Sequence, residues 1–201
     1  MNVICVPSGP LQANSYIVYK NKDEAILIDA GGYQELAKFF EQNSITPKYL
    51  LLTHGHFDHC SGAKDFQEHG CKVYVNENDV EQIKKGLFVE SFNIDYRPVV
   101  PDCYLVEGEM ELLGMSIKII HTPGHTEGGV SFLIEDCLFT GDTLFHRNIG
   151  RTDLLGGDSE KIKESLKKLF SIDGDCKVYP GHGDSTNLDI ERTFFARWLK
   201  L

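Results

Sequence analysis

The sequence lacks the long apolar segments that membrane proteins need. No stretch approaches the ~20 apolar residues of a membrane-spanning helix. The first residues, Met1 to Pro7, have neither a basic flank nor a long apolar run, so they do not read as a secretory signal. We therefore expect a cytoplasmic protein with no membrane partner, and a secreted enzyme is disfavoured.

Positive charge and paired cysteines are also scarce. Asp and Glu outnumber Lys and Arg by 30 to 20, which gives a net charge of -10. Because phosphate backbones attract basic surfaces, nucleic acid is an unfavourable partner. The six cysteines are scattered and form no CxxC pair. This pattern favours reduced, buried thiols over a disulfide framework.

The length of 201 residues allows one sizeable core, and we predict a single domain over residues 1–201. Apolar patterns of period two, and short continuous apolar runs, predict strands at 2–6, 15–19, 25–29, 48–53, 72–75, 104–112, 115–121, 130–134, 137–140 and 177–179. Helical spacing predicts helices at 33–43, 63–69, 159–170 and 187–199, and 77–85 is compatible with another. Residues 86–103 have no clear period, and we expect an irregular excursion that either lines a site or only covers surface.

Two of the predicted helices have recognisable starts. Asp158 is placed to cap the helix at 159–170. Thr186 and Asp189 resemble a capping box before the last helix, which aligns Ile190, Phe194 and Trp198 on one face.

The most informative stretch is Thr53 to Gly62, which directly follows the apolar run 49–52. Within six residues it contains His54, His56, Asp58 and His59, each able to donate a lone pair to a cation. In an extended segment alternate side chains share a face, so His54, His56 and Asp58 would point one way and His59 another. Polar loops at strand ends often hold a single His or Asp, but this density predicts metal binding, and two pockets starting from one loop.

Three more residues with metal-binding side chains each follow a predicted strand and adjoin a glycine. They are His125, Asp142 and His182. Together with the loop they make seven donors, which is too many for one tetrahedral zinc ion. Seven donors suit two ions that share one bridging carboxylate and keep open positions for water.

The chain resembles the metallo-β-lactamase superfamily, in particular its glyoxalase II-like (hydroxyacylglutathione hydrolase-like) branch. The resemblance rests on four motifs in order: Thr-His-Gly-His-Phe-Asp-His (53–59), Thr-Pro-Gly-His-Thr (122–126), Thr-Gly-Asp-Thr-Leu-Phe (140–145) and Pro-Gly-His-Gly (180–183). It implies an α+β fold, a four-layer αβ/βα sandwich with the metals at one edge. It also implies that His54, His56 and His125 hold one metal, that Asp58, His59 and His182 hold the other, and that Asp142 bridges them.

The resemblance has further implications and two departures. Flavodiiron members of the superfamily have a glutamate where this chain has His56, so the resemblance favours a hydrolase. Full-length glyoxalase II continues into a helical domain that supplies much of its glutathione site, whereas this sequence stops at Leu201. The family's Gly-His-Glu-Tyr is replaced by Gly-His-Gly-Asp at 181–184, which removes a tyrosine that would contact substrate.

The chemistry expected of such a centre is hydrolysis. Two divalent ions, for which zinc is expected and iron is the alternative, share a water whose pKa falls toward ~7. The resulting hydroxide, oriented by Asp58 as the catalytic residue, would attack an acyl carbonyl. A thiolate, whose conjugate acid has a pKa near ~8.5, leaves without a general acid, so we expect a small-molecule acyl thioester as substrate.

Several other residues have two possible roles each. Asp29 is either a partner of a ligand histidine or a simple turn residue. Arg151 matches a basic position that binds substrate in glyoxalase II, and it either anchors a carboxylate or forms an internal salt bridge. His121 is expected to be structural, His146 lies either at the cleft or at the surface, and Cys60 is expected to pack in the core.

Two other functions remain open. Gly-Arg-Thr-Asp at 150–153 also occurs in the superfamily's persulfide dioxygenases, which resemble glyoxalase II but use one iron and oxygen. Imidazole and carboxylate ligands suit iron as well as zinc. The other alternative is a non-enzymatic metal-binding protein.

Overall fold

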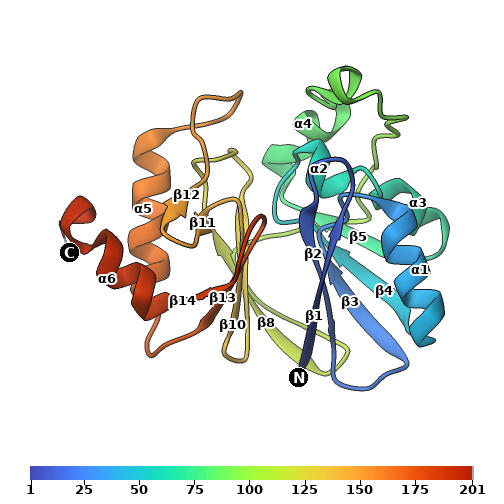
Figure 1. Ribbon diagram of the computed structural model, residues 1–201, viewed down its shortest axis with the longest axis horizontal. Coiled ribbons are helices and arrows are strands. Elements are labelled where there is room, and N and C mark those ends of the chain that lie inside the picture. Colours follow the sequence, from blue (N-terminus) through green and yellow to red (C-terminus); the bar gives the residue numbers. More distant parts are fainter. Residues whose placement is uncertain (201) are drawn as a thin grey trace.

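Two six-stranded sheets packed face to face form the centre of the fold (Figure 1). The computed structural model describes residues 1–200. The first sheet has the order β1 (Asn2–Ser8), β2 (Ala13–Tyr19), β3 (Glu24–Ile28), β4 (Thr46–Leu51), β5 (Lys72–Val75) and β6 (Cys103–Tyr104). The second has the order β14 (Thr186–Asn187), β13 (Lys177–Pro180), β10 (Cys137–Gly141), β9 (Val130–Ile134), β8 (Met115–His121) and β7 (Gly108–Leu112).

Helices cover the outer face of each sheet (Figure 1). Helices α1 (Tyr33–Asn43) and α3 (Ala63–Glu68) share an apolar core with the first sheet. Helices α5 (Ser159–Phe170) and α6 (Leu188–Leu199) share another with the second sheet. A third core fills the space between the sheets. The layers are therefore helix, sheet, sheet and helix, which confirms the predicted αβ/βα sandwich.

The continuous apolar runs of the sequence are the strands buried on both faces. On β2, Ile17 packs toward the helices, while Tyr16 and Val18 pack between the sheets. On β3, Leu27 packs toward the helices and Ile28 packs between the sheets. Successive side chains of a strand point to opposite faces, so a strand with a core on each side must be apolar throughout.

Parallel pairing brings the strand ends that matter to one edge of each sheet. Strands β3, β4 and β5 pair in parallel in the first sheet, and β10 pairs in parallel with β13 in the second. Strand β8 runs in the same direction as β10, because both are antiparallel to β9. Within each sheet, the segments that follow these strands therefore leave at the same edge.

Three local expectations are corrected. The predicted strand at 104–112 is divided between β6 and β7, which belong to different sheets, so the chain crosses from one sheet to the other within it. Helix α6 exposes Ile190, Phe194 and Trp198 and buries Leu188, Glu191, Phe195 and Leu199 instead. The capping box is absent: Asn187 is the N-cap residue, and Thr186 donates its hydroxyl to Glu191.

Short elements complete the chain. Helix α2 is Phe57–Cys60, α4 is Val80–Lys85, and Glu77–Asp79 and Val89–Phe92 form the 3-10 turns η1 and η2. Strands β11 (Leu144–Phe145) and β12 (Asn148–Ile149) form a small hairpin. Apart from η2 and β6, residues 86–103 are irregular, as expected.

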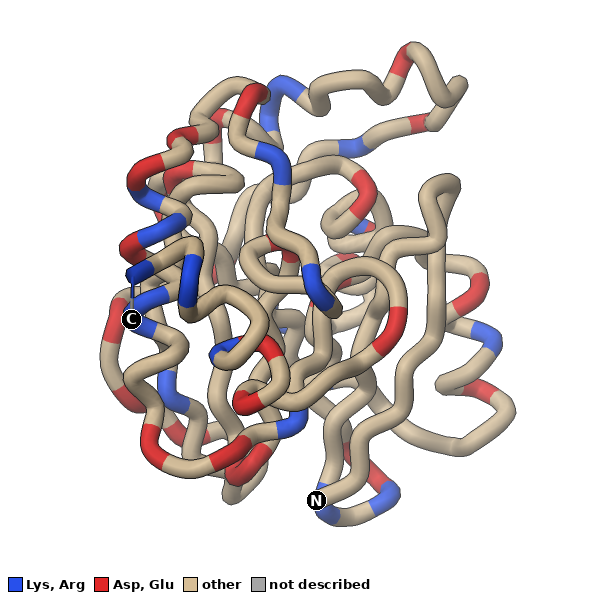
Figure 2. Tube along the Cα trace, turned by 60° about the vertical axis from the view of Figure 1, so that its left-hand side comes forward, with Lys and Arg blue, Asp and Glu red and all other residues tan. Residues whose placement is uncertain are grey.

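Charges of both signs are interspersed along the chain, as Figure 2 shows. Helix α5 pairs Glu160 with Lys163 and Glu164 with Lys167 on its exposed side. All six cysteines lie within the described residues, and none forms a disulfide. None of the helices found in residues 1–200 combines the length and the apolar character that crossing a bilayer requires.

Candidate metal centre

The histidine-rich loop begins where β4 ends and turns into helix α2 after five residues, 52–56. Thr53 accepts a backbone hydrogen bond from Val130, 2.8 Å away, which joins the two sheets at this point. His56 is still extended and is the N-cap residue of α2. Asp58 and His59 lie on the helical turn, so the expected grouping of Asp58 with His54 and His56 on one extended face is wrong. The helical turn instead aims Asp58 to the same side as His59.

Two clusters of potential ligands result. His54, His56 and His125 bring ring nitrogens within 4.8 Å of one another, and so do the ligand atoms of Asp58, His59 and His182. In the first cluster, Nδ1 of His56 lies 2.8 Å from Nε2 of His125. In the second, Nε2 of His182 lies 3.3 Å from Nε2 of His59 and 3.2 Å from Oδ2 of Asp58. The loop thus serves two pockets, as predicted.

Asp142 lies between the clusters. Its Oδ2 is 3.4 Å from Nε2 of His125 and 3.7 Å from Nε2 of His182. Its Oδ1 is 3.4 Å from Nε2 of His59. One carboxylate therefore faces donors of both clusters, which is the placement that a bridging ligand requires. All seven residues predicted as ligands are brought together at this edge of the sandwich.

The donor set fits cations. Ligand atoms about 2.0–2.2 Å from a tetrahedral ion lie roughly 3.3–3.6 Å apart, close to the separations in the second cluster. Among residues 1–200, Nε2 of His54, Nε2 of His56 and Oδ1 of Asp142 are buried without a hydrogen-bond partner. Buried polar atoms are normally paired, so unpaired nitrogen and oxygen atoms on three of the candidate ligands agree with a site that a metal would satisfy.

The protonation states of His54, His56 and Asp142 also suit ligands. Burial and the neighbouring His125 lower the pKa of His56 to about 3, and burial and His59 lower the pKa of His54 well below its usual range. Both imidazoles are therefore neutral at neutral pH, as metal ligands must be. Burial opposes ionisation of Asp142, but the attraction of His59 and His125 outweighs it and lowers the pKa of that carboxyl.

Asp29 supports the loop from the end of β3. Its carboxylate accepts hydrogen bonds from the backbone N–H and the hydroxyl of Thr53, each at 2.7 Å, and lies 2.8 Å from Nδ1 of His59. A carboxylate in this position orients the ring so that Nε2 faces the cluster. Asp29 is therefore a partner of a ligand histidine and not a simple turn residue.

A second supporting carboxylate, Asp79, was not found from sequence. It lies in η1 after β5 and is fully buried. Its Oδ2 accepts from the N–H of Gly55 at 2.8 Å and the hydroxyl of Thr126 at 2.7 Å, and its Oδ1 accepts from the N–H of Gly128 at 2.7 Å. One side chain thus joins the loop of His54 and His56 to the loop of His125. Its position beyond β5, at the same sheet edge as the histidine loop, was the available signal.

The loop carrying His182 is held by two residues of β2 that sequence reasoning also missed. The side-chain amide of Asn14 donates to the carbonyls of Pro180 at 3.0 Å and Gly183 at 2.9 Å. The hydroxyl of Tyr16 donates to Pro180 at 2.6 Å. The first sheet therefore positions a ligand that belongs to the second sheet.

The remaining candidates lie around the centre. The backbone carbonyl of Arg151 is 2.8 Å from Nδ1 of His125, while its guanidinium is exposed and pairs with Asp153 at 2.7 Å. His146 is exposed beside the cleft, and His121 contacts the carbonyl of Glu127 away from the centre. Cys60 is buried near the hydroxyl of Tyr96, which agrees with a packing role.

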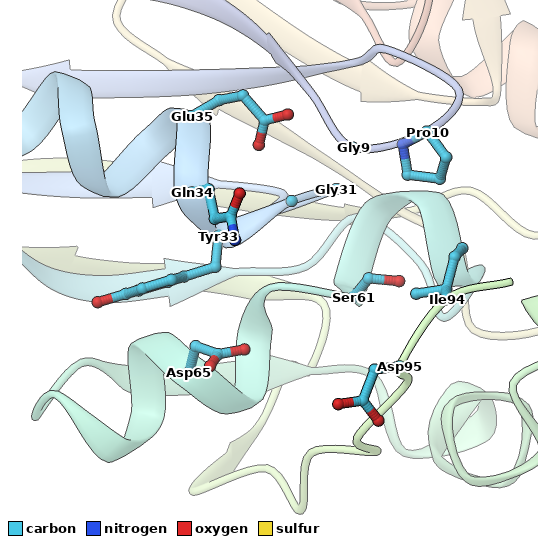
Figure 3. Close-up of a pocket in the computed structure, with 11 residues that line it drawn as sticks. Gly9, Pro10, Gly31, Tyr33, Gln34, Glu35, Ser61, Asp65, Ile94 and Asp95 are labelled. Atoms are coloured by element: carbon cyan, nitrogen blue, oxygen red, sulfur yellow. The ribbon is translucent and has the colours of Figure 1, made fainter.

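Two clefts open next to the clusters. The smaller has a volume of about 280 Å³ and is largely apolar beyond its contact with His56, Asp58, His125 and Asp142. The larger has a volume of about 530 Å³ and is lined mainly by polar residues. A separate hollow of about 470 Å³ lies between Glu35 of α1 and the pair Asp65 and Asp95 (Figure 3). None of the seven predicted ligands lines that hollow, so it is not part of the metal centre.

Comparisons with known proteins agree with the geometry. The family model of the metallo-beta-lactamase superfamily matches residues 8–182. Hydroxyacylglutathione hydrolase GloC of Haemophilus influenzae is 35% identical over 209 residues, which cover 96% of this chain and 95% of that protein.

Two solved structures are similar over most of their length. The crystal structure of BLEG-1 B3 metallo-beta-lactamase has a TM-score of 0.87 at 31% identity and covers 96% of this chain and 97% of its own. That of TTHA1623 in a di-iron-bound form has a TM-score of 0.85 at 34% identity, with 94% and 96% covered. These similarities define a metallo-hydrolase. The chain belongs to the metallo-beta-lactamase superfamily, and the resemblance inferred from its four motifs is confirmed.

Proposed function

We propose that this protein hydrolyses acyl thioesters at a centre of two divalent metal ions, with zinc as the working metal. The observation that carries the proposal is Asp142, whose carboxylate faces both ligand clusters at 3.4–3.7 Å. In this proposal His54, His56 and His125 hold one ion, Asp58, His59 and His182 hold the other, and Asp142 contacts both. GloC, a relative along almost its whole length, is named as a hydroxyacylglutathione hydrolase, which supports the substrate class.

Bound divalent cations supply an activated water and polarise a carbonyl oxygen. The chain's own residues would hold the ions and orient the attacking water. Asp58 is ionised at neutral pH, because His59 and His182 lower its pKa despite its burial. It can therefore accept a proton or a hydrogen bond from the attacking water. Asp29 and Asp79 fix the rings and loops around it, so that the donors need little rearrangement.

Hydrolysis of a thioester adds the elements of water and yields a carboxylate, a thiol and a proton. The C–S bond breaks, and the thiol leaves as a thiolate whose conjugate acid has a pKa near ~8.5. Such a leaving group needs no acid, which agrees with the donor set: Asp58 and Asp142 both have lowered pKa values and are poor proton donors. An amide nitrogen would need a proton, so amides are the less suitable substrates.

We further propose that Arg151 binds a carboxylate on the thiol part of the substrate. Its guanidinium is exposed at the mouth of both clefts, and among residues 1–200 it is engaged only by the exposed Asp153. Exposed ion pairs contribute little, so a substrate carboxylate could replace Asp153 at low cost. Arg151→Ala should raise KM for a thioester whose thiol carries a carboxylate and leave a small uncharged thioester nearly unaffected. Asp153→Asn is the matched control, and an equal response to both substrates in Arg151→Ala would assign Arg151 a structural role.

The experiment that tests the reaction is hydrolysis of a 2-hydroxyacyl thioester by the zinc-loaded protein without oxygen. Release of free thiol, at a rate that falls sharply in Asp142→Ala, is the expected result. A persulfide dioxygenase needs oxygen and iron instead. Inert zinc protein, together with oxygen consumption by the iron-loaded protein in the presence of glutathione persulfide, would replace the hydrolase with that enzyme. Inactivity in both assays would favour a non-enzymatic metal-binding protein.

A cytoplasmic, reducing location is part of the proposal. It rests on the scattered cysteines, five of which are at least partly buried and none of which forms a disulfide. Titration of the denatured protein, purified from cytoplasm without reductant, should find six free thiols. A count of four or fewer would indicate disulfides and contradict this location.

A further inference from the structure

The smaller cleft has two unlike sides. One side consists of His56, Asp58, His125 and Asp142 of the metal centre, together with Arg151. The opposite side is apolar and comes from four separate segments of the chain: Leu11, Phe57, Phe88 with Phe92, and Leu154. Leu11, Phe88 and Phe92 are 41%, 51% and 43% exposed. Large, solvent-exposed apolar side chains thus line the same cleft as the proposed reaction centre.

Phe92 packs against the protein, and Phe88 has an unusual backbone conformation. The ring of Phe92 packs against that of Phe57 with centroids 5.3 Å apart, and Phe57 directly precedes Asp58. Phe88 has a φ of 70°, in the left-handed region that a bulky residue seldom adopts. Such conformations persist only where the surroundings enforce them, and they gather at ligand sites.

The base of this segment is packed against the protein. Tyr96 donates its hydroxyl to the carbonyl of Ile83 at 2.7 Å, and its ring lies against Gly86. A Cβ at Gly86 would approach that ring to 2.6 Å, so the two ends of residues 86–96 pack closely against each other. Because Phe88 and Phe92 line the smaller cleft, the irregular segment lines the site, which was one of the two roles open from sequence.

The two clefts differ in polarity, and the acyl and thiol groups of a thioester can differ in the same property. Outside the residues that both share, the larger cleft is lined by one large apolar side chain, Phe145, and by polar groups that include His146, Asn148 and Asp184. The smaller one has only apolar side chains away from the metal centre. A carbonyl carbon placed at the metal centre has one substituent on each side, so one cleft takes the acyl group and the other takes the thiol. The volume of about 280 Å³ exceeds what a 2-hydroxypropionyl or acetyl group would fill.

We propose that the apolar cleft binds the acyl group of the substrate, and that this group is an apolar chain or ring such as hexanoyl or phenylacetyl. The inference rests on the proposed thioester hydrolysis for its reaction, and on Leu11, Phe88 and Phe92 for its specificity. Burial of apolar surface against these side chains supplies the preference. The alcohol of a small 2-hydroxyacyl group gains nothing from them, and its short carbon chain buries little apolar surface.

The first experiment measures kcat/KM of the zinc-loaded protein for acetyl, 2-hydroxypropionyl, hexanoyl and phenylacetyl thioesters of N-acetylcysteamine. The hexanoyl and phenylacetyl substrates should exceed the acetyl substrate by tenfold or more. Phe88→Ala and Phe92→Ala should each lower kcat/KM for hexanoyl at least fivefold and leave acetyl within twofold. Phe194→Ala is the matched control, because Phe194 is also 51% exposed but lies on α6. Equal kcat/KM for all acyl groups overturns the inference and leaves the hydrolase intact.

The second experiment separates the cleft from the reaction. Calorimetry should show that hexanoate binds the zinc-loaded protein at least tenfold more tightly than acetate, with a more negative heat-capacity change. Leu11→Ala and Phe92→Ala, on different segments, should reduce that preference, and equal binding of the two acids overturns the inference. If the protein hydrolyses none of the thioesters but keeps the preference for hexanoate, the apolar site stands and the proposed reaction fails. If a longer apolar thiol raises kcat/KM while a longer acyl group does not, the assignment of the clefts is reversed and the inference is wrong.

Discussion

Asp142 is the residue whose loss should impair activity most, because its two oxygens face donors of both clusters. At saturating zinc, Asp142→Ala should lower kcat by more than about 100-fold, which exceeds the 10–100-fold typical of losing an outer hydrogen-bond partner. His146→Ala, which removes an exposed side chain beside the same cleft, should leave kcat nearly unchanged. Similar losses of turnover in the two variants would mean that the ligand assignment is wrong.

Asp79 acts by positioning the two histidine loops. Its replacement should therefore change the stability of the fold and the affinity for zinc. In Asp79→Asn an amide N–H₂ replaces one oxygen that now accepts from Gly55, Thr126 or Gly128. At least one buried donor then loses its acceptor, so the free energy of unfolding should fall by about 1–3 kcal/mol. The two histidine loops should also separate, so zinc affinity, measured by competition with a chelator, should fall about 10–100-fold.

Asp102→Asn separates positioning from general stability. Asp102 also accepts a backbone hydrogen bond, from Val73 at 2.8 Å, but it does not contact the ligand loops. The Asp102→Asn variant should therefore be less stable than the unchanged protein but should bind zinc with the same affinity. A drop in zinc affinity of the same size in both variants would show that Asp79 only stabilises the fold.

At the scale of elements, α5 links the second sheet to the His125 loop. The side chain of Asp158 caps the helix by accepting from the N–H groups of Glu160 at 2.8 Å and Lys161 at 3.0 Å. Its own N–H donates to the carbonyl of Gly124 at 2.8 Å. Asp158→Ala removes the cap and keeps the backbone link, so the melting temperature should fall by about 2–4 °C while kcat stays the same.

Asn187 provides the comparison for this cap. It is the N-cap residue of α6 but makes no side-chain capping bond there. Asn187→Ala should therefore lower the melting temperature less than Asp158→Ala does. The reverse order, measured by calorimetry, would contradict the capping argument.

The elements that could be predicted from sequence are those with strong patterns. The cap at Asp158 and the buried strands followed from local chemistry and apolar runs. The face of α6 did not, because its inward stripe includes Glu191 and its outward stripe is more apolar. Glu191 is buried since Thr186 and the backbone of Arg147 donate to it at 2.7 and 2.8 Å. Both donors lie outside the helix, so periodicity alone pointed to the wrong stripe.

The same limit applies to the site. All seven donors could be predicted, because four are crowded into six residues after one strand and each of the other three adjoins a glycine after a strand. The helical turn at α2, which moved Asp58 to the side of His59, could not, since four residues are too few for a helical pattern. Asp79 and Asn14 were missed because they support the site only through hydrogen bonds to loops that lie far from them in the sequence. The folding of the two sheets brings those loops beside them.

For the whole molecule, the metal centre lies where the two sheets meet. The first sheet supplies His54, His56, Asp58 and His59 through β4, and the second supplies His125, Asp142 and His182 through β8, β10 and β13. Bound ions would therefore join the two halves of the sandwich. Without them, the unpaired atoms of His54, His56 and Asp142 remain buried at the junction.

Removal of metal should consequently lower the stability of the entire fold. An ion that binds only the folded state adds RT ln(1 + [L]/Kd), which is about 2.7 kcal/mol at a free concentration of 100 Kd. After chelation and removal of the chelator, the melting temperature should fall, and it should rise again with added zinc until two equivalents are bound. Asp142→Ala, which lacks the shared ligand, should show a smaller response to zinc. If elemental analysis finds the zinc gone while the melting temperature is unchanged, the ions do not join the sheets. Saturation at one equivalent in several preparations would rule out the two-ion centre.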